Sequence, residues 1–109
     1  MTEEQINIAI AEVCGWRKRS TYAGWVHPSG QAGFAGPPDY VTDLNAMHEA
    51  EKTITFSIYE GVTELQSIYI KELWRVMGKP DAGMAAVLVH ATARQRAEAF
   101  LRTLNLWTE

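Results

Sequence analysis

The chain has 109 residues, of which 47% are hydrophobic and 21% are charged, and its formal net charge at pH 7 is −3. This length suits a single domain and is too short for two independent cores, and the composition excludes disorder over the whole length. Because acidic residues outnumber basic ones, the chain as a whole has no attraction for phosphate backbones, and we do not expect nucleic acid as its partner.

Residues 3–14 have the clearest helical pattern. Thr2 and Gln5 form a capping box, and the two glutamates that follow Thr2 lie where the helix dipole favours negative charge. One apolar stripe recurs at helical spacing and consists of Ile6, Ala9, Ile10, Val13 and Cys14. Gly15 provides the left-handed residue that ends many helices.

Cys14 is the only cysteine, so a disulfide within the chain is impossible and a reducing compartment is expected. Its place at the end of an apolar helix favours a buried structural thiol over a nucleophile. The first residues form no targeting pattern, and no apolar run approaches the roughly 20 residues of a membrane span. We therefore expect a cytoplasmic protein with no membrane partner.

Residues 16–39 alternate aromatic side chains with glycines and prolines, which break any helix. The pattern predicts an aromatic-rich loop with a short strand around residues 22–26. Trp16 and Trp25 lie in this segment, so we expect it to pack over the sheet. The basic run of residues 17–19 beside these aromatic residues is a possible surface for single-stranded nucleic acid, against which the acidic charge of the whole chain argues.

A second helix is predicted to begin at a cap formed by Asp39 or Thr42 and to end near Lys52. Its apolar face consists of Tyr40, Leu44, Met47 and Ala50. Residues 53–58 then alternate strictly between polar and apolar side chains, several of them β-branched, which predicts a half-buried strand. The competing interpretation is one long helix that continues from residue 40 into this segment.

A third helix is predicted from a capping box of Thr63 and Gln66 to about Met77, and it carries two apolar stripes. The main stripe consists of Leu65, Ile68, Tyr69, Leu73 and Val76, and the second of Ile70, Trp74 and Met77. A helix that is apolar on two sides is either deeply buried or shared with a partner. We predict a twofold homodimer through the second stripe, with Trp74 as anchor. The alternative is that residues 16–38 cover this stripe within one chain.

Residues 85–89 are short and apolar and predict another strand, after Gly78 has ended the third helix. Thr92 and Gln95 form a third capping box, which opens a last helix that ends near a left-handed Asn105. Its apolar stripe consists of Ala93, Ala97, Phe100, Leu101 and Leu104. Together the elements predict one α+β domain over residues 1–109, a small α-β-α sandwich with about four helices packed on a short sheet.

Three blocks, residues 6–16, 38–52 and 91–107, together resemble the small phage and prophage proteins grouped as the phage ABA sandwich domain. They cover about two fifths of the chain and lie in the family's order, whereas residues 53–90 depart from its pattern. The resemblance implies an α-β-α sandwich encoded by a mobile element and expressed in a bacterial host cytoplasm. It implies no particular activity.

His27, His48 and His90 show none of the spacings typical of a metal site, and no pattern assembles a general acid, a base and a nucleophile. We therefore assign no catalytic residue, no metal and no cofactor.

Arg94 and Thr92 lie at the N-terminus of the last helix, where backbone N–H groups favour anions, although Arg94 and Glu98 also suit an ordinary surface pair. The candidate ligand-binding residues are Trp16, Trp25, His48, Thr92, Arg94 and Arg96.

The sequence thus predicts a phage-encoded, non-catalytic binding or interaction protein that acts on a host or phage component. In its sharper form the ligand is a small anion such as a nucleotide, with aromatic residues of the segment 16–34 stacking the base and Arg94 or Arg96 holding phosphate. The alternative is a small hydrolase or nuclease that uses His48, His90 and a carboxylate.

Overall fold

The computed structural model describes residues 1–18, 24–27, 32–33, 37–55, 64–78 and 89–108. Its helices are α1 (Glu3–Val13), α2 (Leu44–Thr55), α3 (Glu64–Met77) and α5 (Ala93–Thr103), and its strands are β1 (Arg17–Lys18), β2 (Trp25–Val26) and β3 (Ala32–Gly33). These elements form a small α+β fold, which confirms the predicted class. Within these ranges no helix is long and apolar enough to cross a membrane.

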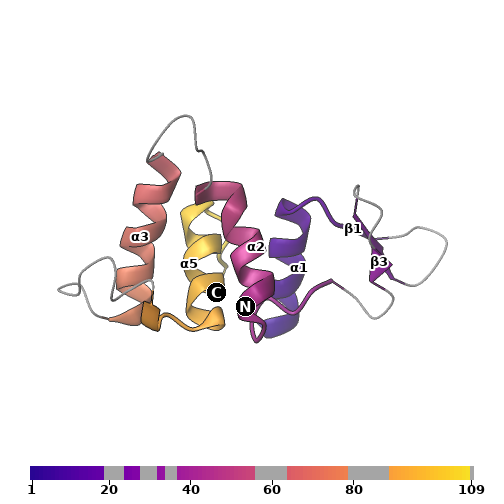
Figure 1. Cartoon of the computed structure of the whole chain (residues 1–109), viewed down its shortest axis with the longest axis horizontal. Helices are drawn as coiled ribbons and strands as arrows, with labels where there is room; N and C mark the ends of the chain where they lie inside the picture. Colours follow the sequence, from indigo (N-terminus) through magenta and orange to yellow (C-terminus); the bar gives the residue numbers. More distant parts are fainter. Residues whose placement is uncertain (19–23, 28–31, 34–36, 56–63, 79–88, 109) are drawn as a thin grey trace.

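The helices lie side by side in a row, with α5 in contact with α1, α2 and α3 (Figure 1). β1 pairs antiparallel with β2, and β2 with β3. This sheet lies at one end of the row, beyond α1 (Figure 1). Where the sequence predicted helices packed on a sheet in α-β-α layers, the described helices pack mainly on one another.

The predicted capping boxes of α1 and α5 are both present. The hydroxyl of Thr2 accepts from the Gln5 N–H at 3.1 Å, and the Gln5 side chain accepts from the Thr2 N–H at 2.8 Å. Thr92 and Gln95 repeat the arrangement at 3.1 and 2.9 Å. Each box satisfies two backbone donors that a helix leaves unpaired at its N-terminus, so both starts are determined locally.

Left-handed residues follow three of the helices, as the sequence predicted for each. The φ angles are 98° at Gly15, 69° at Gly78 and 59° at Asn105. At Gly15 the chain leaves α1, and the next N–H, that of Trp16, donates to the carbonyl of Ala11 at 2.9 Å. This turn directs β1 back alongside α1.

The cap of α2 differs from the prediction. Asp43 is the capping residue, and its carboxylate accepts from the N–H groups of Asn45 at 2.9 Å and Ala46 at 3.3 Å. Asp39 instead accepts from the Thr42 hydroxyl at 2.6 Å and stabilises the turn before the helix. The helix begins later than expected, at Leu44, and this residue is 42% exposed, so its predicted place on the apolar face is wrong.

The strand predicted at residues 53–58 is wrong where the structure describes it, because α2 continues to Thr55. Ile54 lies one helical turn after Ala50, and both are buried, at 5% and 0% exposure. Burial of this side chain in the core favours the helix over the local strand pattern. Residues 56–58 lie outside the described part of the chain.

Two other predictions fall partly or wholly outside the described residues. Thr63, the predicted cap of α3, lies outside the described part of the chain. Residues 85–88 of the last predicted strand also lie outside it. The described end of that strand, Val89, is helical together with His90, and its side chain is 74% exposed. For this residue the strand prediction is wrong.

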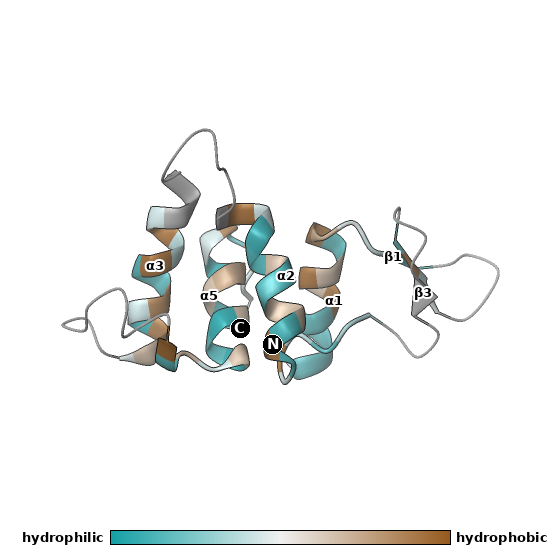
Figure 2. Cartoon of the chain, in the orientation of Figure 1, coloured by the Kyte–Doolittle hydropathy of each residue, from teal (hydrophilic) through white to brown (hydrophobic). Residues whose placement is uncertain are grey.

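The interior lies between the helices, where apolar positions alternate with polar ones along each ribbon (Figure 2). Its fully buried large side chains are Ile6, Ile10, Met47, Tyr69, Leu73, Phe100 and Leu101. All four described helices contribute to it, so none of them buries its apolar face alone. The predicted stripes of α1 and α5 supply four of these residues, which confirms that both terminal helices pack on one core.

Candidate functional site

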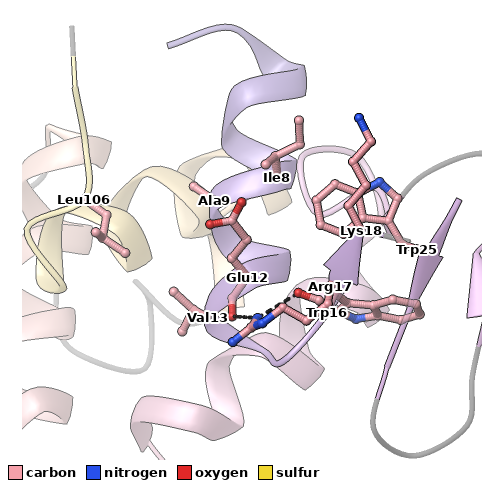
Figure 3. Close-up of a pocket in the computed structure, with 9 residues that line it drawn as sticks. All are labelled: Ile8, Ala9, Glu12, Val13, Trp16, Arg17, Lys18, Trp25 and Leu106. Atoms are coloured by element: carbon pink, nitrogen blue, oxygen red, sulfur yellow. Dashed lines mark hydrogen bonds between the residues drawn. The ribbon is translucent and has the colours of Figure 1, made fainter. Parts of the chain in front are cut away.

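A groove of about 630 Å³ lies between α1 and the sheet (Figure 3). α1 forms one wall, β1 and β2 form the other, and the chain after α5 closes one side. The lining residues are Ile8, Ala9, Glu12, Val13, Trp16, Arg17, Lys18, Trp25 and Leu106. The groove therefore brings together the two tryptophans that the sequence analysis selected and two cations of the basic run.

The α1 wall of the groove is apolar because this helix has apolar side chains on more than its core face. Ile6 and Ile10 are fully buried between the helices, whereas Ile8 lies on the opposite side of α1 and is only partly buried. Val13, which the sequence placed on the same stripe as Ile6 and Ile10, is 36% exposed near the end of the helix. Leu106 is 42% exposed beside it, and its N–H donates to the carbonyl of Leu101 at 2.8 Å, which turns the chain back after α5. The groove thus presents aliphatic surface that the fold leaves accessible to solvent.

The cationic side of the groove begins at the end of α1. One terminal nitrogen of Arg17, Nη1, donates to the carbonyl oxygens of Glu12 at 3.1 Å and Trp16 at 2.8 Å (Figure 3). The guanidinium thereby gives a second donor to the Glu12 carbonyl, which also accepts from the Gly15 N–H at 3.2 Å, and it lies at the helix C-terminus, where the dipole favours a cation. Lys18 is exposed, and its ammonium has no partner among the described residues.

The two tryptophans are not equivalent. Trp16 is 8% exposed, and its ring lies 5.3 Å from the His27 ring, centroid to centroid, at an angle of 56°. Trp25 is only partly buried and lies opposite Lys18 in the pairing of β1 with β2. Trp16 therefore anchors the sheet to the core, and Trp25 provides the accessible aromatic surface.

A second hollow, of about 430 Å³, lies between the end of α1 and α2, and Cys14, His27 and Tyr40 contribute to its lining. Nε2 of His27 lies 2.8 Å from the carbonyl oxygen of Cys14. Burial raises the pKa of the Cys14 thiol, and a hydrogen bond with Tyr40 opposes this effect. The thiol is therefore protonated at neutral pH, and its side chain is only partly buried, where the sequence predicted a buried structural thiol.

A buried polar cluster joins three helices, and the sequence analysis did not find it. Arg96 of α5 is 5% exposed and Glu51 of α2 is 8% exposed. Nη1 of Arg96 lies 3.0 and 3.3 Å from the two Glu51 oxygens, and the Tyr69 hydroxyl of α3 donates to Glu51 at 2.5 Å. Nε of Arg96 donates to the Ala91 carbonyl at 3.2 Å. Arg96, predicted to hold phosphate, is instead occupied by a carboxylate of its own chain.

Helical spacing contains a signal for this cluster. Glu51 lies four residues after Met47, and Arg96 lies four residues before Phe100, and both of these apolar residues are fully buried. A charged residue on the buried face of each of two helices, with opposite signs, indicates a buried ion pair. Which pair of helices brings such charges together depends on tertiary packing and is not contained in either helix alone.

The other candidate residues do not assemble with the groove. Nε2 of His48 lies 4.0 Å from Glu51, beyond hydrogen-bond distance, and its side chain is 52% exposed. Thr92 caps α5, and Arg94 and His90 are exposed. None of these four residues lines the groove. In the described ranges, no three His, Cys, Asp or Glu side chains come together to hold a metal ion.

The second stripe of α3 is partly covered by the chain itself. Ile70 is 6% exposed and so belongs to the interior. Trp74 and Met77 are partly buried against the core, and Nε1 of Trp74 is buried with no hydrogen-bond partner in the part of the chain that the structure describes. Trp74 also borders a hollow of about 410 Å³ with Lys71 and Arg75. Of the three predicted interface residues, only Trp74 and Met77 keep accessible surface.

Comparison of the chain with protein families, with curated proteins and with solved structures found no match. The resemblance to the phage ABA sandwich domain therefore stays a prediction from the sequence. The function has to be argued from the groove and from the chemistry of the residues that line it.

Proposed function

We propose that this chain is a non-catalytic binding protein, and that the groove between α1 and β1 holds an anionic ligand with an apolar part. The observation that carries the proposal is the composition of the groove. An aliphatic wall with the exposed side chains of Val13 and Leu106 lies opposite two cations, Arg17 and Lys18. Glu12 is the only acidic residue among the described residues that line it.

The two halves of this surface support binding in different ways. Burial of the aliphatic wall by a ligand contributes about 25 cal/mol for each Å² removed from water. The Lys18 ammonium, which has no partner in the described ranges, gains a charge-assisted contact when an anion binds. A cationic rim on a chain with a net charge of −3 also favours an anion locally, where the chain as a whole does not.

This proposal moves the predicted anion site from α5 to β1. Arg96 already pairs with Glu51 in the interior, and Arg94 lies outside the groove. The sequence resemblance supports a phage or host component as the source of the ligand. The hydrolase alternative has less support, because the carboxylate nearest to His48 already accepts hydrogen bonds from Tyr69 and Arg96.

Titration with 8-anilinonaphthalene-1-sulfonate, an anion with two aromatic rings, tests the proposal. We expect saturable binding that Val13→Asp and Lys18→Glu each weaken at least about tenfold, since one removes apolar contact and the other reverses a rim charge. Lys71→Glu makes the same charge change on α3, outside the groove, and is expected to leave binding unchanged. Cooperative urea unfolding of each variant ensures that the dye reports a folded protein.

Equal dye binding by the wild type and both groove variants would contradict the proposal. So would amide chemical-shift changes that map to α3 and the N-terminus of α5 instead of α1 and β1.

A further inference from the structure

β1 is an edge strand in the part of the sheet that the structure describes. The strand order is β1-β2-β3, so β1 has a hydrogen-bonded neighbour on one side only. Residues of an antiparallel pair alternate in the direction of their backbone groups, and one of Arg17 and Lys18 therefore turns its N–H and C=O away from β2. Such an edge is a template for another strand. The groove lies beside β1, between it and α1 (Figure 3).

We infer that the groove binds an extended, acidic peptide segment that pairs with β1 as an added strand. This inference rests on the proposed function and names the class of its ligand. In strand addition, main-chain hydrogen bonds provide affinity, and contacts with alternate side chains provide specificity. The groove has both parts, an unpaired strand edge and a wall with defined apolar positions.

The apolar wall matches the spacing of an extended peptide. Ala9 and Val13 lie one turn apart on the same side of α1, about 6 Å along the helix axis. Side chains on one face of a strand recur every two residues, or about 6.7 Å. Two successive apolar side chains of a bound strand can therefore contact the two ends of the wall, with Leu106 at its side.

Charge selects an acidic peptide over a basic one. The side chains that alternate with the apolar ones point away from the wall. Arg17 and Lys18 are consecutive residues of β1 and face opposite sides of the sheet, so these side chains meet one of the two cations and the other lies on the side of the wall. Both cations are exposed, and Lys18 has no partner among the described residues. Carboxylates at these positions form charge-assisted hydrogen bonds, whereas basic side chains are repelled.

A nucleotide or single-stranded nucleic acid fits this surface less well. Recognition of a base without hydrogen-bond readout needs an accessible aromatic face. Trp16 is 8% exposed and packs against His27, so it offers little of its ring. Trp25 lies directly opposite Lys18, and side chains at such positions lie within contact distance. Trp25 is thus the one partly exposed ring among the described lining residues, and the aliphatic stem of Lys18 beside it competes for the face that a base would need.

Fluorescence anisotropy with labelled heptapeptide pools tests the inference. The probe pool alternates Val, Leu or Ile with Asp or Glu. Two comparison pools replace the acids with Lys or Arg, or group the same apolar residues in one block. We expect the acidic alternating pool to bind at least about tenfold more tightly than either, because only it matches both the strand spacing and the rim charge. Val13→Asp and Lys18→Glu are expected to abolish the difference, and Lys71→Glu to keep it.

Peptide N-methylation separates strand pairing from side-chain contact. In two versions of the tightest binder from the acidic pool, backbone amides are methylated on one edge or on the other. Pairing with β1 requires that one version loses binding at least about tenfold while the other keeps it, since only one edge meets β1.

Each other outcome overturns the inference. Equal binding of the two methylated peptides shows that no added strand forms. The groove could instead bind adenosine triphosphate or a single-stranded oligonucleotide and no peptide. That result would show that the ligand is a nucleotide, which overturns the inference and leaves the proposed function intact. If neither peptides nor these anions nor the naphthalene dye bind the groove, the proposed function fails together with the inference.

Discussion

A carboxylate, a phenol and a guanidinium meet in the interior where α2, α3 and α5 converge. Burial of a charge costs several kcal/mol unless the charge is paired and hydrogen-bonded. Glu51 meets this requirement through Arg96 and the Tyr69 hydroxyl, which lie on two other helices. The cluster therefore favours one particular arrangement of these three helices over others that an apolar core of the same size would permit.

Glu51→Gln is expected to lower the free energy of unfolding by about 3–5 kcal/mol, because it leaves the buried Arg96 guanidinium without its anion. Urea titration followed by circular dichroism measures the change. Glu49→Gln is the matched control, since its pair with Lys52 at 2.9 Å is exposed, and we expect a change below about 0.5 kcal/mol. Similar losses for the two variants would show that the Glu51 pair contributes no more than a surface pair.

Stability is expected to fall at alkaline pH. Burial raises the pKa of Cys14 above its ordinary value of 9.0, and it raises those of Tyr40 and Tyr69 above 10.0. The Glu51 carboxylate raises the pKa of Tyr69 further. These groups hold their protons more tightly in the folded chain than in the unfolded one. Their contribution to stability is therefore complete below the unfolded pKa values and is lost as pH rises through the folded ones.

Urea titrations at about pH 8 and about pH 10.5 measure this loss. Tyr69→Phe removes one of the three groups and is expected to reduce the difference between the two conditions. A wild-type chain that is equally stable at both values would contradict the assignment.

Phe100→Ala is expected to cost about 3–5 kcal/mol, the range for emptying a buried aromatic site. Phe100 is fully buried, and the structure confirms its predicted place on the inner stripe of α5. Val89→Ala is the control, because that side chain is 74% exposed. A loss below about 1 kcal/mol for Phe100→Ala would mean that the core collapses around the missing ring.

Among the elements, α5 contacts all three other described helices, so the loss of its cap affects packing with each of them. Thr92→Ala is expected to cost about 0.5–2 kcal/mol by removing the acceptor for the Gln95 N–H, and Thr92→Ser to restore most of it. Urea titration of both variants tests this. An alanine variant as stable as the wild type would show that water or another group satisfies the donor equally well.

The segment after Ala50 shows how packing overrides a local pattern. Thr53, Ile54 and Thr55 alternate between polar and apolar residues as a strand would. Ile54 decides between the two, because helical geometry places it four residues after Ala50 in the core, where it is 5% exposed. The hydroxyl of Thr53 donates to the Ala50 carbonyl at 2.8 Å, a contact that helical spacing provides.

At the scale of the whole molecule, self-association through α3 stays a prediction. Its surface is smaller than the sequence indicated, because Ile70 is buried and Trp74 and Met77 are only partly exposed. We expect a dimer at micromolar concentration that Trp74→Glu converts to a monomer, since a charge in an apolar interface is not satisfied. Sedimentation equilibrium measures both. A monomeric wild type would show that the chain covers this stripe by itself.

The two chain ends meet in the folded molecule, where the Met1 amino group donates to the Thr108 carbonyl at 3.2 Å (Figure 1). This contact, like the groove and the buried cluster, joins segments far apart in the sequence. Local patterns contain no information on which such segments become neighbours.

The sequence by itself determined the features that depend on residues within one or two helical turns. These are the capping boxes at Thr2 and Thr92, the left-handed positions of Gly15 and Asn105, and the inner stripes of the terminal helices. Tertiary structure decided the extension of α2, the placement of the sheet beyond α1 and the pairing of Glu51 with Arg96. It also decided that Trp25 and Lys18 share a groove with α1, whereas Arg94 does not. The physical reason is that caps and turns are satisfied by neighbouring backbone groups, whereas burial and charge pairing depend on which helices pack together.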